Sequence, residues 1–112
     1  MIKRIFSIFI LTLLIVFSSP VYSLDTSSKT IEKYTNRISN KFIRTYCNTT
    51  KFGISYEGAL AFAIGETNKE FKKNKFNKFI DLTLLKNSIV NGLEDCQIYD
   101  FPKSSLEKLE FE

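Results

Sequence analysis

The chain contains no histidine and no tryptophan, and only one methionine, two prolines, two cysteines and four glycines among its 112 residues. Without histidine it lacks the side chain that most often moves protons near neutral pH and most often binds metals. The sequence also has no glycine-rich phosphate loop, nucleophile elbow or zinc-ligand pattern. We therefore expect a protein that is not an enzyme, holds no metal and needs no cofactor.

The N-terminus has the three-part layout of a secretory signal peptide. Lys3 and Arg4 precede an apolar stretch at 5–17, and Ser23 provides a small residue before a cleavable bond. The stretch is shorter than the roughly 20 residues that a helix needs to cross a bilayer. We predict a signal peptide at 1–23, cleaved after Ser23, with an uncleaved N-terminal anchor as the alternative. The mature domain at 24–112 would then be exported.

Charge argues against nucleic acid as a partner. The formal net charge of the whole chain is +4. Without Lys3 and Arg4 it falls to +2, because 14 Lys and Arg residues then stand against 12 Asp and Glu. Domains that bind nucleic acid usually keep a strong basic excess. We expect no nucleic-acid partner for the mature chain.

Both cysteines, Cys47 and Cys96, lie in the part predicted to be exported. An even pair in an oxidising compartment is typical of a disulfide bond. Closing this loop would stabilise the fold by about 4 kcal/mol on the loop-entropy model. A two-cysteine metal site is the alternative, but the chain offers neither histidine nor a second cysteine pair to complete it.

Apolar residues repeat at helical spacing in three segments. The first helix is predicted from about residue 28 to 46, and the pattern breaks from Asn48 to Gly53. The second begins after Ser55, a good N-cap, and the third after Asp81. The predicted buried positions are Ile31, Tyr34, Ile38, Phe42 and Thr45 in the first, Tyr56, Leu60, Ile64, Thr67 and Phe71 in the second, and Leu82, Leu85, Ile89, Leu93 and Cys96 in the third.

The second helix has another stripe, nearly opposite the first, of small residues beside Phe62. A helix that is apolar on opposite sides is usually buried between neighbours. We therefore predict that one neighbour approaches this helix closely at Gly58, Ala61 and Gly65.

The C-terminus is predicted to form a short helix. Ser104 and Glu107 have the spacing of a capping box, and Leu106, Leu109 and Phe111 would pack back on the other helices. In an up-down-up arrangement the first and third helices end at the same pole, which brings Cys47 and Cys96 together. The predicted fold is all-α: a small three-helix bundle with a short C-terminal helix, joined by one disulfide.

A basic segment at 69–79 has five lysines interleaved with three phenylalanines. Such a segment can bind an anionic membrane or another polyanion, with the phenylalanines inserting. The alternative, which we favour, is a solvated helix end and turn whose phenylalanines face the core. The candidate residues are Lys69, Lys72, Lys73, Lys75 and Lys78, with Phe71, Phe76 and Phe79 between them.

Carboxylates give the weakest candidates for chemistry. Glu66 and Glu70 are four residues apart on the second predicted helix, where a pair can act as acid and base or face a cation. Because Lys69, Lys72 and Lys73 are close in sequence, a neutralised helix surface is the simpler interpretation.

The sequence contains a motif made of a cysteine, a short loop, a Gly-x-Ser-x-Glu start of a helix and a later cysteine, Cys96. Its stretches are Tyr46-Cys47-Asn48, Phe52-Gly-Ile-Ser-Tyr-Glu57 and Phe62-Ala-Ile-Gly-Glu-Thr-Asn68. In these stretches the chain resembles small uncharacterised exported proteins of marine picocyanobacteria. The resemblance implies export to a periplasm, a thylakoid lumen or the outside of the cell. No activity is assigned to that family, so the resemblance supplies no catalytic residue.

Three hypotheses for function follow. The first is a non-enzymatic protein-interaction module that binds an unknown protein partner through its surface. The second is a peripheral protein bound to an anionic membrane surface, or to another polyanion, through the basic segment. The third, an enzyme or ligand carrier built around Glu57 or Glu66, would require a deep pocket with a buried carboxylate.

Overall fold

The computed structural model describes residues 27–111, so the predicted signal peptide at 1–23 lies outside the described residues. Residues 27–111 form three α-helices and three short 3₁₀ helices, without a strand. This confirms the predicted all-α bundle of three helices with a short C-terminal helix. The elements are α2 (Ser28–Lys51), α3 (Tyr56–Phe71), η1 (Lys75–Phe79), α4 (Leu82–Leu93), η2 (Glu94–Cys96) and η3 (Lys103–Lys108).

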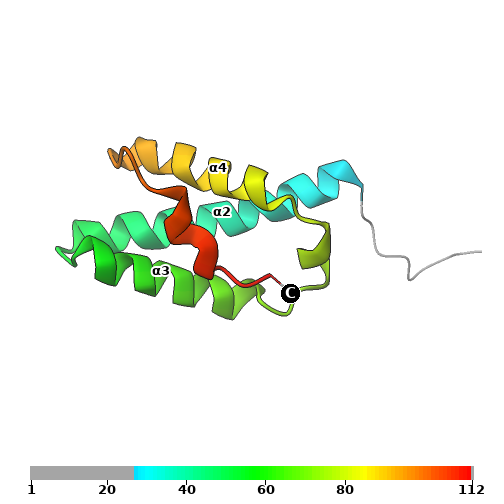
Figure 1. The fold of residues 1–112 in the computed structure, drawn as a ribbon, viewed down its shortest axis with the longest axis horizontal. Coiled ribbons are helices and arrows are strands. Elements are labelled where there is room, and N and C mark those ends of the chain that lie inside the picture. The colour runs from blue at the N-terminus through cyan, green and yellow to red at the C-terminus, as the bar shows by residue number, and fades with distance from the viewer. Residues whose placement is uncertain (1–26, 112) are drawn as a thin grey trace, which may run out of the picture.

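Helix α2 is the centre of the bundle. It packs against both α3 and α4, and Figure 1 shows it between them. The C-terminal segment crosses from α4 towards α3, and η3 contacts both helices. The two helices that flank α2 are therefore bridged by the end of the chain.

Two predicted N-caps set the starts of the outer helices. The Ser55 hydroxyl accepts a hydrogen bond from the backbone N–H of Gly58, 3.2 Å away. The Asp81 carboxylate accepts from the N–H groups of Thr83 and Leu84. Each cap satisfies backbone donors that the first helical turn leaves free, so α3 and α4 begin where the sequence predicts.

The core forms mainly along the predicted stripes. Helix α2 contributes a stripe of fully or nearly fully buried side chains, and α4 contributes another of the same kind. Two predicted core positions are wrong, since Tyr56 and Leu82, the first residues of their helices, are both exposed. The main buried residues are Tyr34, Ile38, Phe42, Ile64, Phe71, Leu85, Ile89 and Leu93.

Helix α2 continues five residues beyond its predicted end at Tyr46, to Lys51. The hydroxyls of Thr49 and Thr50 donate to backbone carbonyls one turn earlier, within the helix. These polar residues therefore fit the last helical turns, and the chain reverses only at Gly53, whose φ is +84°.

The predicted close neighbour along the small residues of α3 is absent from the described part of the chain. Ala61, Phe62 and Gly65 are exposed, and a Cβ atom at Gly65 would meet no described atom within 4 Å. Ala59 and Ala63 are the fully buried small residues of this helix. A small side chain tolerates solvent as easily as a tight contact, so a stripe of small residues does not by itself indicate a close neighbour.

The C-terminal helix forms, but not as a capping box. It starts at Lys103 after Pro102 as a 3₁₀ helix with no side-chain cap. Proline already favours the extended backbone that precedes a helix, so the chain turns before Ser104 can cap it. Leu106 is fully buried against the bundle and Leu109 is half-buried, as predicted.

Candidate interaction surface at the disulfide end

The disulfide joins Cys47 of α2 to Cys96 of η2, across 49 residues of sequence, with Cα atoms 6.2 Å apart. Helices α2 and α4 end at the same pole, as predicted from the up-down-up arrangement (Figure 1). The bond therefore fixes the start of the loop that leads from η2 to η3.

That loop folds back over α2 through unusual backbone conformations. Gln97 and Asp100 adopt left-handed φ angles of 64° and 59°, which non-glycine residues seldom do. Directly after Asp100, Phe101 is buried and its ring packs edge-on against Tyr46 and Phe42, at 5.4 and 6.2 Å between ring centroids. The buried ring holds the loop down and leaves Tyr99 65% exposed.

Exposed apolar side chains gather at this pole. Phe52 and Tyr56, in and just after the turn between α2 and α3, are 85% and 69% exposed, and Ile54 between them is also exposed. Tyr56 and Tyr99 line the same hollow, and Phe52 and Ile54 lie in the turn that leads to Tyr56. We call Phe52, Ile54, Tyr56 and Tyr99 the aromatic surface.

A hollow of about 570 Å³ lies between α2, the first turn of α3 and the loop. Three tyrosines line it, of which Tyr46 is buried and the other two belong to the aromatic surface. Burial raises the pKa of Tyr46, and the nearby Tyr56 raises it further, so this hydroxyl stays neutral. Two carboxylates, Glu57 and Asp100, also line the hollow and both are exposed.

The carboxylates that the sequence suggested for chemistry are not brought together in a buried site. Glu57 is exposed at the hollow, whereas Glu66 is half-buried elsewhere on α3. Glu70 is paired with Lys41 of α2, with 3.6 Å between the charged atoms. Within residues 27–111, no group of three or more His, Cys, Asp or Glu side chains is arranged to hold a metal ion.

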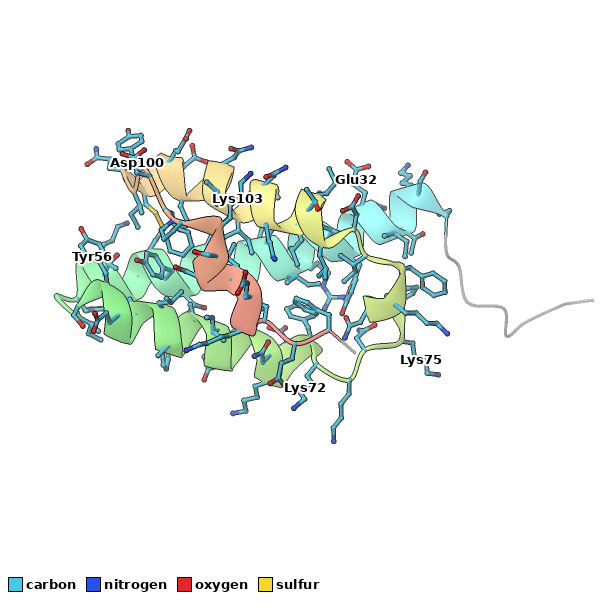
Figure 2. All side chains as sticks on the ribbon, viewed as in Figure 1. Glu32, Tyr56, Lys72, Lys75, Asp100 and Lys103 are labelled. Carbon is cyan, nitrogen blue, oxygen red and sulfur yellow. A yellow bond between two sulfur atoms is a disulfide. The ribbon has the colours of Figure 1, made fainter. Side chains whose placement is uncertain are left out.

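The basic segment lies at the opposite end of the bundle. Figure 2 shows Lys72 and Lys75 far from Tyr56 and Asp100 along the long axis. The five lysines span the end of α3, the following turn and η1, and all are exposed. Lys72 forms an ion pair with Glu110 at 2.7 Å, and the ammonium of Lys78 lies 5.3 Å from the centre of the Phe79 ring.

The three phenylalanines of this segment differ in burial. Phe71 is buried and Phe76 half-buried, and both rings contact Tyr34 of α2, at 5.7 and 5.5 Å between centroids. Phe79 is 42% exposed, and the apolar side chains of Leu82 and Leu84 that follow it are more exposed still. The interpretation that all three phenylalanines face the core is therefore wrong for Phe79.

A buried polar contact positions the basic segment. Asn77 of η1 accepts a hydrogen bond from the Tyr34 hydroxyl through Oδ1 and donates through Nδ2 to the carbonyls of Phe71 and Lys72. One asparagine thus ties the end of α3 and η1 to α2.

The aromatic surface is the feature that the sequence reasoning missed. Phe52 and Ile54 flank Gly53 in a short turn, and Tyr99 precedes Pro102 by three residues. Large apolar residues in turns are often exposed, because short connections run over the surface. That signal is present in the sequence, but the helical spacing of α3 places Tyr56 with the predicted core residues.

Comparisons with protein-family models, with curated proteins and with solved structures found no match to this chain. The resemblance to exported picocyanobacterial proteins therefore stays a prediction. Over residues 27–111, no helix has both the length and the apolar character required to span a bilayer.

Proposed function

We propose that this chain is an exported, non-enzymatic interaction module that binds a protein partner through the aromatic surface at its disulfide end. The observation that supports the proposal most strongly is the exposure of four large apolar side chains, Phe52, Ile54, Tyr56 and Tyr99, at one pole. Contiguous exposed apolar patches often mark interaction sites. Tyrosine and phenylalanine are enriched in the buried centres of protein interfaces.

The scaffold under this surface supports the same proposal. The Cys47–Cys96 bond and the buried Phe101 ring hold the loop that carries Tyr99. A surface that is ordered before it binds loses less conformational entropy on association. A disulfide is also compatible with the oxidising compartment that export after Ser23 would supply.

Site-specific photocrosslinking tests the proposal. A benzophenone amino acid is placed at position 56, in the aromatic surface, and the control variant has it at Asn40, an exposed position in the middle of α2. In the cells that make the protein, we expect a discrete crosslinked species from position 56 and none from position 40. Equal crosslinking from both positions, or none from position 56, would contradict the proposal.

The second candidate is a peripheral protein on an anionic membrane surface. It is favoured by the exposed Phe79, which directly follows Lys78 of the basic segment, and by the exposed Leu82 and Leu84 a few residues later. Each lysine near an anionic bilayer contributes about 1 kcal/mol, and exposed apolar side chains can insert at the interface.

Liposome sedimentation tests this second candidate. Vesicles with 30% phosphatidylserine are compared with vesicles of phosphatidylcholine alone, at low and high salt. A membrane function predicts binding only to the anionic vesicles, lost in high salt and lost when Lys69, Lys73, Lys75 and Lys78 become Gln. Absence of binding at low salt would exclude it.

A further inference from the structure

We propose that the hollow at the disulfide end accepts a lysine or arginine side chain from the partner protein. This inference rests on the proposed function, since it assigns a chemistry to the partner of the aromatic surface. The occupant is a basic peptide segment, with its cationic group between Glu57 and Asp100 and its apolar stem against Tyr56 and Tyr99.

The charged side chains that line the hollow are both acidic. Glu57 comes from the first turn of α3 and Asp100 from the loop after η2, and both line the same hollow. Of the described residues that line it, none is Lys or Arg. Lys51 precedes Glu57 in the sequence and Lys103 follows Asp100, but neither lysine lines the hollow. A chain with a basic excess overall therefore has a hollow whose charged side chains are all acidic.

The tyrosines supply the second argument. The faces of their rings are negatively polarised and attract ammonium and guanidinium groups within about 6 Å. Long basic side chains also lay their apolar stems on apolar surfaces while the charged head stays near water. Tyr56 and Tyr99 are largely exposed at the hollow, so both rings are available for these contacts.

Size and rigidity complete the case. The hollow of about 570 Å³ falls within the range of roughly 300 to 1,000 Å³ that is usual for ligand sites. It leaves room beside one basic side chain for neighbouring residues of the partner. The buried ring of Tyr46 lines it and packs against the rings of Phe42 and Phe101. This part of the site is therefore already ordered before a partner binds.

Peptide titrations followed by NMR test the inference. The probes are four acetylated, amidated hexapeptides that differ only at the third position, which is Arg, Lys, Gln or Glu among alanine and leucine. The ¹⁵N-labelled protein with its disulfide intact is titrated at low salt. We expect amide shifts at residues 56–60 and 97–101, and affinities for the Arg and Lys peptides about fivefold or more above the Gln peptide.

Two double variants separate a site from a general charge effect. Glu57→Gln with Asp100→Asn removes both carboxylates of the hollow, and asparagine also tolerates the left-handed φ at position 100. Glu94→Gln with Asp95→Asn makes the same charge change in η2, at residues outside the lining. The first variant is expected to bind the Arg and Gln peptides equally, and the second to keep most of the preference for Arg.

The outcomes distinguish this inference from the function on which it rests. Shifts in the hollow with no preference for a cation, or equal losses in both double variants, would overturn the cation site and leave the interaction surface intact. No shift in the hollow with any peptide would also overturn the cation site. The photocrosslinks from position 56 then decide the proposed function on their own.

Discussion

Ile43 of α2 lies so close to Gly92 of α4 that a methyl group at position 92 would overlap its Cδ1 atom. Among the glycines of the described helices, Gly92 leaves the least space for an added methyl group. Gly65 of α3 is the opposite case, since a Cβ there would meet no described atom within 4 Å. A side chain at position 65 therefore has open space, whereas a side chain at position 92 must displace part of Ile43.

Alanine at these two positions is expected to change stability by different amounts. Gly65→Ala gains helix propensity and should raise the free energy of unfolding by about 0.5 to 1 kcal/mol. Gly92→Ala gains the same propensity, but the Cδ1 end of the Ile43 side chain must move away, which offsets part or all of that gain. Urea denaturation of both variants measures the difference, and equal effects would contradict the close approach.

The disulfide should dominate stability under oxidising conditions. Removing the bond with Cys47→Ser and Cys96→Ser frees a long loop in the unfolded chain, with an expected loss of about 4 kcal/mol. Reduced wild type and the double variant should unfold at nearly the same urea concentration. If the oxidised wild type unfolded there as well, the bond would contribute nothing.

The protein is expected to lose stability at high pH because the Tyr34 hydroxyl is buried. Burial raises the pKa of Tyr34 to about 12 from its ordinary value of 10.0, although the charge of Arg37 opposes the shift. Between pH 10 and 12 the unfolded chain loses this proton first, so the folded state is stabilised below pH 10 and loses that advantage as pH rises. The loss is on the order of 2 kcal/mol.

The Tyr34→Phe variant supplies the control, because it cannot ionise at this position. Its free energy of unfolding should fall less steeply than that of wild type between pH 10 and 12. It should also be less stable at pH 7, since Asn77 loses the hydroxyl that donates to its Oδ1. Parallel pH profiles for the two proteins would show that Tyr34 titrates normally.

Asn68 is expected to hold the C-terminal segment on the bundle. Its side chain donates to the carbonyl of Lys108 at 3.0 Å and accepts from the N–H of Glu110 at 2.8 Å. Asn68→Ala should speed proteolysis after residue 102 and cost about 1 to 2 kcal/mol of stability. Asn40→Ala, at an exposed position of α2, is the matched control, and equal cleavage of both variants would contradict this role.

The helices were predictable because their signals are local. Ser55 and Asp81 cap α3 and α4 through backbone groups two or three residues away, and apolar spacing identifies the core stripes of α2 and α4. The disulfide was predictable because the chain, which we predict to be exported, has only two cysteines and so allows one pairing within it. The helix starts depend on contacts between residues close in the sequence, and the disulfide has one possible pairing within the chain.

The site was not predictable because it depends on contacts between distant segments. The hollow exists because the loop after Cys96 turns back through left-handed residues and anchors Phe101 beside Tyr46. Nothing in the local sequence indicates that Tyr56 and Tyr99 meet there. The exposed face of α3 was mispredicted for a related reason, since small residues do not reveal whether a neighbour is present.

Intact mass spectrometry of the full chain, recovered from the extracytoplasmic fraction of a bacterial cell and measured with and without reductant, tests the most basic requirement of the proposed function. The proposal predicts a species that begins at Leu24 and gains two hydrogen atoms on reduction, which would establish export, cleavage after Ser23 and the Cys47–Cys96 bond together. A full-length, reduced species held in the membrane would contradict the proposal and make the apolar stretch at 5–17 an anchor.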